Sequence, residues 1–129
     1  MVVSPASRSK FVESSVKLLE DYGLDGLDID YEYPQNDEQA RGYTHLLKEL
    51  RHALDEHQRK KGTGCRFLLT VFIVSLSTVV IPSTCFVQIA APCGPQNYHK
   101  LHVAEMDHYL DFWNLMAYDY GKAYHLPPL

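Results

Sequence analysis

Several patterns that mark nucleic-acid-binding or metal-binding proteins are missing from this sequence of 129 residues. It has 12 basic and 16 acidic residues, a formal net charge of −4, and no basic run longer than Arg59-Lys60-Lys61. Binding to a phosphate backbone needs clustered positive charge, so we predict no nucleic-acid partner. The seven histidines form no HExxH motif and no ligand spacing with cysteine, so we predict no metal site. No cofactor is predicted either.

Cysteine is scarce, and a secretion signal is missing from the start of the sequence. Cys65, Cys85 and Cys93 are odd in number and form no CxxC motif, which argues against a disulfide framework. The first ten residues, MVVSPASRSK, lack the apolar stretch of a signal peptide. The sequence therefore leaves the cellular location open.

The composition is that of a globular protein, with 46% hydrophobic and 22% charged residues. The length fits one ordinary domain. We expect a first helix from about Lys10, capped by Ser7 or Ser9, because its apolar residues recur at helical spacing. Gly23 should end this helix, since glycine tolerates the left-handed conformation found there.

The rest of the chain is predicted to alternate between strands and helices. A long second helix should follow the capping pair Asn36 and Gln39 and end at Gly62. Alternating strands and helices indicate a parallel sheet of the α/β class. The other expected elements are an acidic strand before the second helix, strands over Arg66–Thr70 and Asp111–Tyr120, and a helix over Pro95–Asp111.

The stretch DGLDIDYEYP, residues 25–34, is predicted to be a strand with one acidic face. Alternate side chains of a strand share a face, so Asp28, Asp30 and Glu32 should line up over roughly 13 Å. Like charges this close resist ionising together, so the three carboxylates should share protons as a coupled set. Such a face indicates a candidate active site. The apolar residues expected on the opposite face are Leu27, Ile29 and Tyr31.

Two competing interpretations of the acidic stretch have to be weighed. A solvated strand face would account for the charges without any function. A calcium loop of the EF-hand type starting at Asp28 needs glycine at its sixth position, where Tyr33 stands. The mouth of a parallel barrel accommodates an acidic strand face, because catalytic groups project there from the ends of the strands.

The acidic pattern of residues 25–32 and the stretch MAYD at residues 116–119 resemble the two signatures of glycoside hydrolase family 18, the chitinases. The family usually has tryptophan where Tyr31 stands, which is a mild departure. The second signature, MxYD, is matched by MAYD at residues 116–119. The stretches LLKELRHAL and GPQNYHKLHVAEMDHYLDFWNLMAYDY are especially similar to fungal chitinases. The first signature, DxxDxDxE, is matched at all four acidic positions, by Asp25, Asp28, Asp30 and Glu32.

The resemblance implies an α/β fold, as a fragment of a TIM (β/α)8 barrel. The acidic strand would be the fourth strand of the barrel, RFLLT would start the fifth, and DFWNLMAYDY would be the sixth. The chain would then cover roughly strands 4 to 6 with their helices. A whole barrel needs about 250 residues, so residues 1–129 would form a partial catalytic domain of about half that size.

The resemblance also implies a chitinase, a hydrolase that cleaves β-1,4 bonds between N-acetylglucosamine units. Its partner would be chitin or a chito-oligosaccharide. Enzymes of this family work by substrate-assisted retaining catalysis, in which the acetamido oxygen of the substrate is the nucleophile. Glu32 would be the general acid, Asp30 would hold the acetamido N–H, and Asp28 would serve as a proton reservoir.

The other motif residues have implied roles as well. Asp25 would be structural, in the turn that enters the strand, and Gly26 would belong to the same structural motif. Tyr118 would hydrogen-bond the acetamido oxygen and orient it for its attack. The substrate-binding residues implied by the resemblance are Tyr33, Met116, Ala117, Tyr118 and Asp119.

Three alternatives to a chitinase stay open. An endo-β-N-acetylglucosaminidase acting on N-glycans can carry the same acidic signature. A chitin-binding lectin on the same barrel typically loses the acid, so the presence of Glu32 argues against it. A defective fragment is the third alternative, because a half barrel leaves strand edges unpaired. The resemblance further implies a monomer without a membrane partner, and an extracellular location for full-length relatives.

Residues 71–88 have no counterpart in the family pattern. The uncharged run over residues 67–98 is long enough for a membrane span, but it contains Pro82 and many serines and threonines. The segment could also be an inserted hairpin or a translated intron, and we favour the intron. Its excision joins Thr70 to Ile89 and leaves a family-like strand. A valine codon begins with GT and a glutamine codon can be CAG, as at intron ends.

Overall fold

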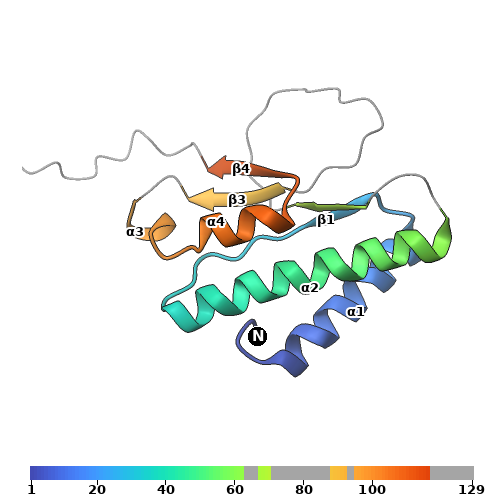
Figure 1. Cartoon of the computed structure of the whole chain (residues 1–129), viewed down its shortest axis with the longest axis horizontal. Coiled ribbons are helices and arrows are strands. Elements are labelled where there is room, and N and C mark those ends of the chain that lie inside the picture. Colours follow the sequence, from blue (N-terminus) through green and yellow to red (C-terminus); the bar gives the residue numbers. More distant parts are fainter. Residues whose placement is uncertain (63–66, 71–87, 93–94, 117–129) are drawn as a thin grey trace, which may run out of the picture.

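The computed structural model describes residues 1–62, 67–70, 88–92 and 95–116. Two long helices lie on one side of short parallel strands, and shorter helical segments lie beside the last strands (Figure 1). The helices are α1 (Pro5–Tyr22), α2 (Asp37–Lys61), α3 (Pro95–Tyr98), α4 (Val103–Met106) and the 3-10 helix η1 (Asp107–Tyr109). The strands are β1 (Gly26–Asp28), β2 (Leu68–Thr70), β3 (Gln88–Pro92) and β4 (Phe112–Met116).

Helix α1 begins earlier than the sequence predicts. Pro5 occupies its first turn, where a missing N–H costs nothing, and the Ser4 hydroxyl accepts a hydrogen bond from the Ser7 amide at 3.3 Å. The predicted start at Lys10 with Ser7 or Ser9 as cap is therefore wrong. The predicted end is confirmed, because Gly23 has φ 63° and its N–H donates to the Leu19 carbonyl.

Helix α2 has the predicted caps and a buried apolar face. The Asn36 side chain accepts a hydrogen bond from the Gln39 amide at 2.9 Å, and Gly62 ends the helix with φ 65°. The buried face of α2 packs against Leu19 of α1, Ile29 after β1 and Leu69 of β2. The residues of α2 in this core are Tyr43, Leu46, Leu47, Leu50 and Leu54.

The strands pair in parallel, as predicted, but within the described part of the chain they form two separate two-stranded sheets. β1 pairs with β2, and β3 pairs with β4. The acidic strand is shorter than the predicted residues 25–34, because its pairing with the described part of β2 runs only as far as Asp28, opposite Thr70. β3 was not predicted as a strand in its own right.

The helix predicted over Pro95–Asp111 is wrong, because the chain breaks it into α3, α4 and η1. Between α3 and α4, the Leu101 amide donates a hydrogen bond to the Tyr98 carbonyl at 3.0 Å. Leu101 and Met106 both pack against the core. Five residues make nearly one and a half turns of a helix, so a straight helix would hold these two side chains on different sides. The break brings both inward, and Met106 is fully buried.

The start of α4 is tied to the start of α2 by a side-chain contact. The Nε2 atom of His102 lies 2.8 Å from the Oδ1 atom of Asp37. This hydrogen bond lowers the pKa of the exposed Asp37 carboxyl below its ordinary value. Residues far apart in the sequence thus meet at the carboxyl-terminal side of β1, close to where the acidic stretch runs into α2.

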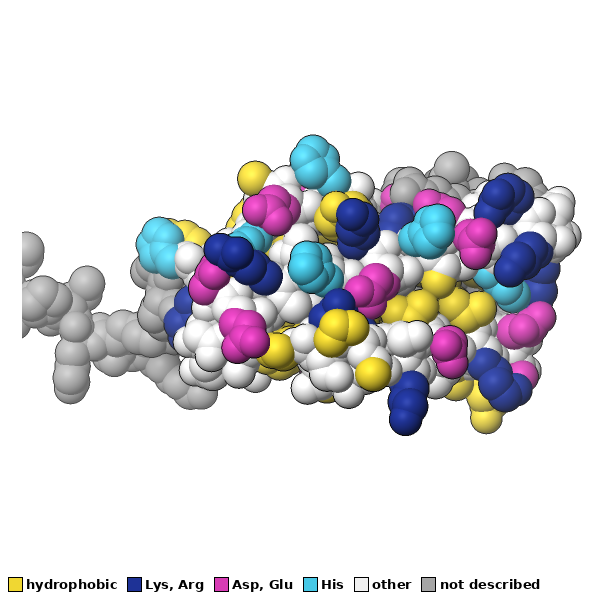
Figure 2. Space-filling view, turned by 60° about the horizontal axis from the view of Figure 1, so that its bottom comes forward, with side chains coloured by type: hydrophobic (Ala, Val, Ile, Leu, Met, Phe, Trp, Pro, Cys, Tyr) yellow, Lys and Arg dark blue, Asp and Glu magenta, His cyan; other side chains and the backbone are white. Residues whose placement is uncertain are grey.

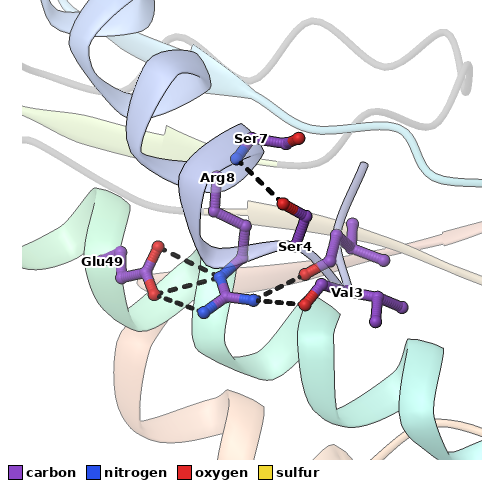
Figure 3. A network of polar contacts seen from close by, with 6 residues as sticks. Val3, Ser4, Ser7, Arg8 and Glu49 are labelled. Atoms are coloured by element: carbon purple, nitrogen blue, oxygen red, sulfur yellow. Dashed lines mark hydrogen bonds and ion pairs between the residues drawn. The ribbon is translucent and has the colours of Figure 1, made fainter.

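A buried arginine holds the first residues of the chain against the two long helices. Figure 3 shows Arg8 pointing from α1 toward Glu49 of α2, with its Nε atom 3.0 Å and 3.2 Å from the two carboxylate oxygens. The Nη1 atom donates to the carbonyl oxygens of Val2 at 2.8 Å and Val3 at 3.3 Å. The guanidinium therefore fixes the chain start in contact with α2.

The close approach of the chain start to α2 depends on Gly42. A Cβ atom there would lie 2.7 Å from the Val2 carbonyl oxygen. Gly42→Ala is expected to lower the free energy of unfolding by about 1–3 kcal/mol, as overpacking does. At an exposed glycine inside a helix, the same change to alanine would instead raise the free energy of unfolding by about 1 kcal/mol. Urea unfolding, with the exposed His45→Ala as control, checks the sign, and a stabilised Gly42→Ala would contradict the described packing.

The outer face of the helical layer carries charges of both signs, interspersed over the surface in Figure 2. No large area of one sign is visible on this face. Among the described residues, no helix is long and apolar enough to cross a membrane. All three cysteines lie outside the described residues. Residues 71–87 do so as well, and they are most of the segment 71–88, for which a membrane span, an inserted hairpin and a translated intron are the alternatives.

Candidate active site

The acidic face predicted from the sequence is present in the structure. Asp28, Asp30 and Glu32 are all exposed along β1 and the extended stretch that follows it. Between them, Ile29 is 9% exposed and belongs to the core, whereas Leu27 and Tyr31 pack against the core from the same side. The alternation continues past the last paired residue of β1, because the helix-facing side chains hold the stretch extended. The three acidic residues therefore alternate with the core-facing residues of the stretch.

Hydrogen bonds to Gln39 of α2 hold the segment around Glu32. The side-chain oxygen of Gln39 accepts from the Tyr31 hydroxyl at 3.1 Å and from the Gln35 amide at 2.9 Å. The Gln35 side chain in turn donates to the Tyr33 carbonyl at 2.7 Å. The peptide bond between Glu32 and Tyr33 is cis. One glutamine in the first turn of α2 thus tethers residues on both sides of the candidate acid.

Sequence reasoning missed this role of Gln39, which was predicted only as a capping residue. The pairing with Tyr31 could have been found, because Tyr31 stands where the family usually has tryptophan. A hydroxyl at that position needs a partner when the ring packs against a core. Gln39, in the first turn of the following helix, supplies it.

Tyr43 supports the acidic stretch from the core side. Its hydroxyl lies 3.4 Å from the Ile29 carbonyl oxygen, and its ring meets the Tyr31 ring edge-on with centroids 5.3 Å apart. Burial, and to a smaller extent the charges of Asp30 and Asp28, raises the pKa of the Tyr43 phenol above its ordinary value. Tyr43 is therefore a neutral hydrogen-bond donor beneath the carboxylates.

A pocket of about 370 Å³ borders two of the three carboxylates. Glu32 does not line it, and most of its wall is apolar, so this pocket alone is not a sugar site. It lies between the chain start, the two long helices and the acidic stretch. Its lining residues are Met1, Val2, Phe11, Asp28, Ile29, Asp30, Tyr31 and Leu46.

The other predicted site residues are only partly within the described chain. Asp25 is exposed just before β1, and Gly26 is the first residue of β1. Tyr33 is half-buried. Met116 is the last residue of β4, and Ala117, Tyr118 and Asp119 lie outside the described residues. Among the described residues, no group of three or more potential ligands could hold a metal ion.

Tyr31→Phe is expected to lower the free energy of unfolding by about 1 kcal/mol, because it removes one partly buried hydrogen bond. Tyr22→Phe is the matched control, since that tyrosine is 73% exposed. In a Gln39→Ala background the effect of Tyr31→Phe should vanish, because the acceptor is already gone. A double-mutant cycle by urea unfolding measures this, and fully additive effects would contradict the coupling.

Comparison with known proteins agrees with the motifs. The family model described as "Glycosyl hydrolases family 18" matches residues 1–127. The chain belongs to this family. Endochitinase 1 of Metarhizium anisopliae is 39% identical over 119 residues, which cover 92% of this chain and 24% of that protein. Chitinase 1 of Aphanocladium album is 40% identical over 121 residues, which cover 94% of this chain and 24% of that protein.

Solved structures of family 18 proteins share the fold of this chain. A family 18 N-acetylglucosaminidase from Paenibacillus barengoltzii superposes with a TM-score of 0.70 at 28% identity, over 92% of this chain and 31% of that one. A family 18 chitinase from Cycas revoluta, solved in complex with (GlcNAc)4, gives 0.69 at 27% identity, over 92% and 30%. These are TIM-barrel proteins, so the chain is a fragment of that fold. It spans about a quarter of its curated relatives.

Proposed function

We propose that this chain is the acid-bearing part of a hydrolase that cleaves β-1,4 bonds in chitin. The observation that carries the proposal is the row of exposed carboxylates at Asp28, Asp30 and Glu32, set on a stretch whose other face is packed into the core. Membership of glycosyl hydrolase family 18 and similarity to fungal chitinases support the choice of substrate.

The position of the carboxylates favours a substrate-assisted mechanism. All three project from one side of one stretch, so none of them can approach the sugar from the opposite side as a nucleophile. Glu32 donates its proton to the glycosidic oxygen, and the acetamido oxygen of the substrate attacks the anomeric carbon to give an oxazolinium ion. Asp30 accepts a hydrogen bond from the acetamido N–H during this step, and Asp28, next to Asp30 on the same face, serves as a proton reservoir. Water then opens the oxazolinium ion, with Glu32 as base, and the anomeric configuration is retained.

Within the barrel, we assign β1 to the fourth strand and β4 to the sixth, with the fifth between them. Tyr33, Met116, Ala117, Tyr118 and Asp119 would bind the sugar beside the acid. The chain spans about a quarter of its curated relatives, so the other barrel strands of a whole family 18 protein would contribute further sugar contacts.

The proposal is tested by comparing two tetrasaccharides that differ in the nucleophile. Chitotetraose carries the acetamido group, whereas cellotetraose has a hydroxyl in its place. We expect cleavage of chitotetraose only, with the β-anomer released first in a proton NMR time course. Cleavage of both sugars, or initial release of the α-anomer, would contradict the mechanism.

A further inference from the structure

The strands β2 and β3 belong to two different sheets. β2 pairs in parallel with β1, with Leu69 opposite Leu27, and β3 pairs in parallel with β4, with position 89 opposite Trp113. β2 and β3 contact each other, and their arrows follow one another in the same direction in Figure 1. Within the described residues, no strand pairing joins the two sheets.

The two halves can be compared by the face that each turns to the helices. Leu69 is fully buried in the core beneath β2, and Trp113 of β4 packs against the same core. Residues opposite each other in a parallel pair lie on the same face of the sheet. Position 89 therefore belongs to the helix-facing side, as Leu69 does. In one continuous strand, two such positions must be separated by an even number of steps.

We infer that β2 and the part of β3 from position 89 onward are the two halves of one strand, and that the segment 71–88, which includes the first residue of β3, interrupts it. Removing this segment puts Thr70 directly before Ile89, so that Leu69 and Ile89 are two steps apart on one face. Removing only the segment 71–87 would put these two positions three steps apart. Every position of β3 would then lie on the opposite face of the sheet. The strand registers thus require that the removed segment has an even number of residues, which holds for 71–88 and not for 71–87, independently of any codon.

The joined strand would bring the two family motifs level with each other. Continuing the register of Asp28 and Thr70 sets Glu32 opposite Pro92, and Pro92 is already opposite Met116 in the pairing of β3 with β4. The acid and the first residue of the second motif would then lie two strand spacings apart, roughly 10 Å. This consequence rests on the proposed function, whereas the strand junction does not.

The test compares three proteins: the full chain, the chain lacking the segment 71–88, and the chain lacking the segment 71–87. The two deletions differ only in whether Gln88 is kept, so composition and chain length are closely matched. We expect the 71–88 deletion to melt cooperatively, at least about 5 °C above both other proteins, as followed by circular dichroism. The 71–87 deletion should lose this gain because its register is reversed.

A 71–88 deletion that melts no higher than the full chain, or no higher than the 71–87 deletion, would overturn the inference. Titration of the same three proteins with chitotetraose separates this outcome from failure of the proposed function. The expected melting order without any sugar binding would leave the strand junction standing and remove the chitinase assignment. Sugar binding without the expected melting order would overturn the strand junction and leave the chitinase assignment standing.

Discussion

Glu32→Gln is expected to lower the rate of chitotetraose hydrolysis by at least about 100-fold, because a general acid contributes on the order of 10² to 10⁴ to such a reaction. Glutamine keeps the size of the side chain but has no proton to give to the glycosidic oxygen. The loss should appear in kcat, with KM changed little, since Glu32 acts on the leaving group rather than in ground-state binding.

Glu38→Gln is the matched control for this experiment. Glu38 is exposed, lies nearby in the first turn of α2, and loses the same charge when it is changed to glutamine. Its variant should keep the parent rate. Equal loss in both variants would show a general effect of charge, and an unchanged rate for Glu32→Gln would remove the acid assignment.

Arg51→Ala is expected to lower the free energy of unfolding by about 3–5 kcal/mol, the cost of breaking a buried ion pair. Arg51 is 5% exposed. Its Nη1 atom donates to the Phe67 carbonyl at 2.9 Å, just before β2, and its Nη2 atom donates to Asp55 at 2.5 Å. Nη1 also lies 3.8 Å from Asp111, just before β4. One guanidinium thus ties α2 to the starts of two strands in different sheets.

Arg41→Ala provides the comparison on the same helix. Arg41 also pairs with an aspartate one helical turn away, Asp37, but both side chains are more than 60% exposed. An exposed pair of this kind contributes little to stability, because solvent screens its charges. In urea unfolding, the loss in free energy of unfolding should therefore be several-fold larger for Arg51→Ala than for Arg41→Ala. Similar small losses in both would contradict the role of Arg51 in joining the helical layer to the strands.

The features that sequence reasoning predicted correctly depend on local chemistry. Gly23 and Gly62 end their helices because their left-handed backbone favours glycine, and Asn36 caps α2 with its own side chain. The alternation of acidic and apolar residues in the stretch around Asp30 follows from the two-residue period of an extended chain. Each of these signals lies within a few residues, so no tertiary information was needed.

The features that were missed or wrong depend on contacts between distant residues. Arg8 and Glu49 are 41 positions apart, and their pairing is not visible in either helix alone. The break after α3 exists because Leu101 and Met106 both have to reach a core built mostly by α2. β3 was missed because its paired partner β4, which defines its register, follows only after three intervening helical segments.

The central claim, that the acidic face of this chain binds a chitin oligomer, is tested most directly by titrating the isotope-labelled chain with chitotetraose and following its amide NMR signals. The account predicts saturable shifts at Asp28 to Tyr33, and none on the exposed outer face of α1, for example at Lys17. Saturable shifts confined to other surfaces, or no saturable shift at the acidic stretch, would contradict it.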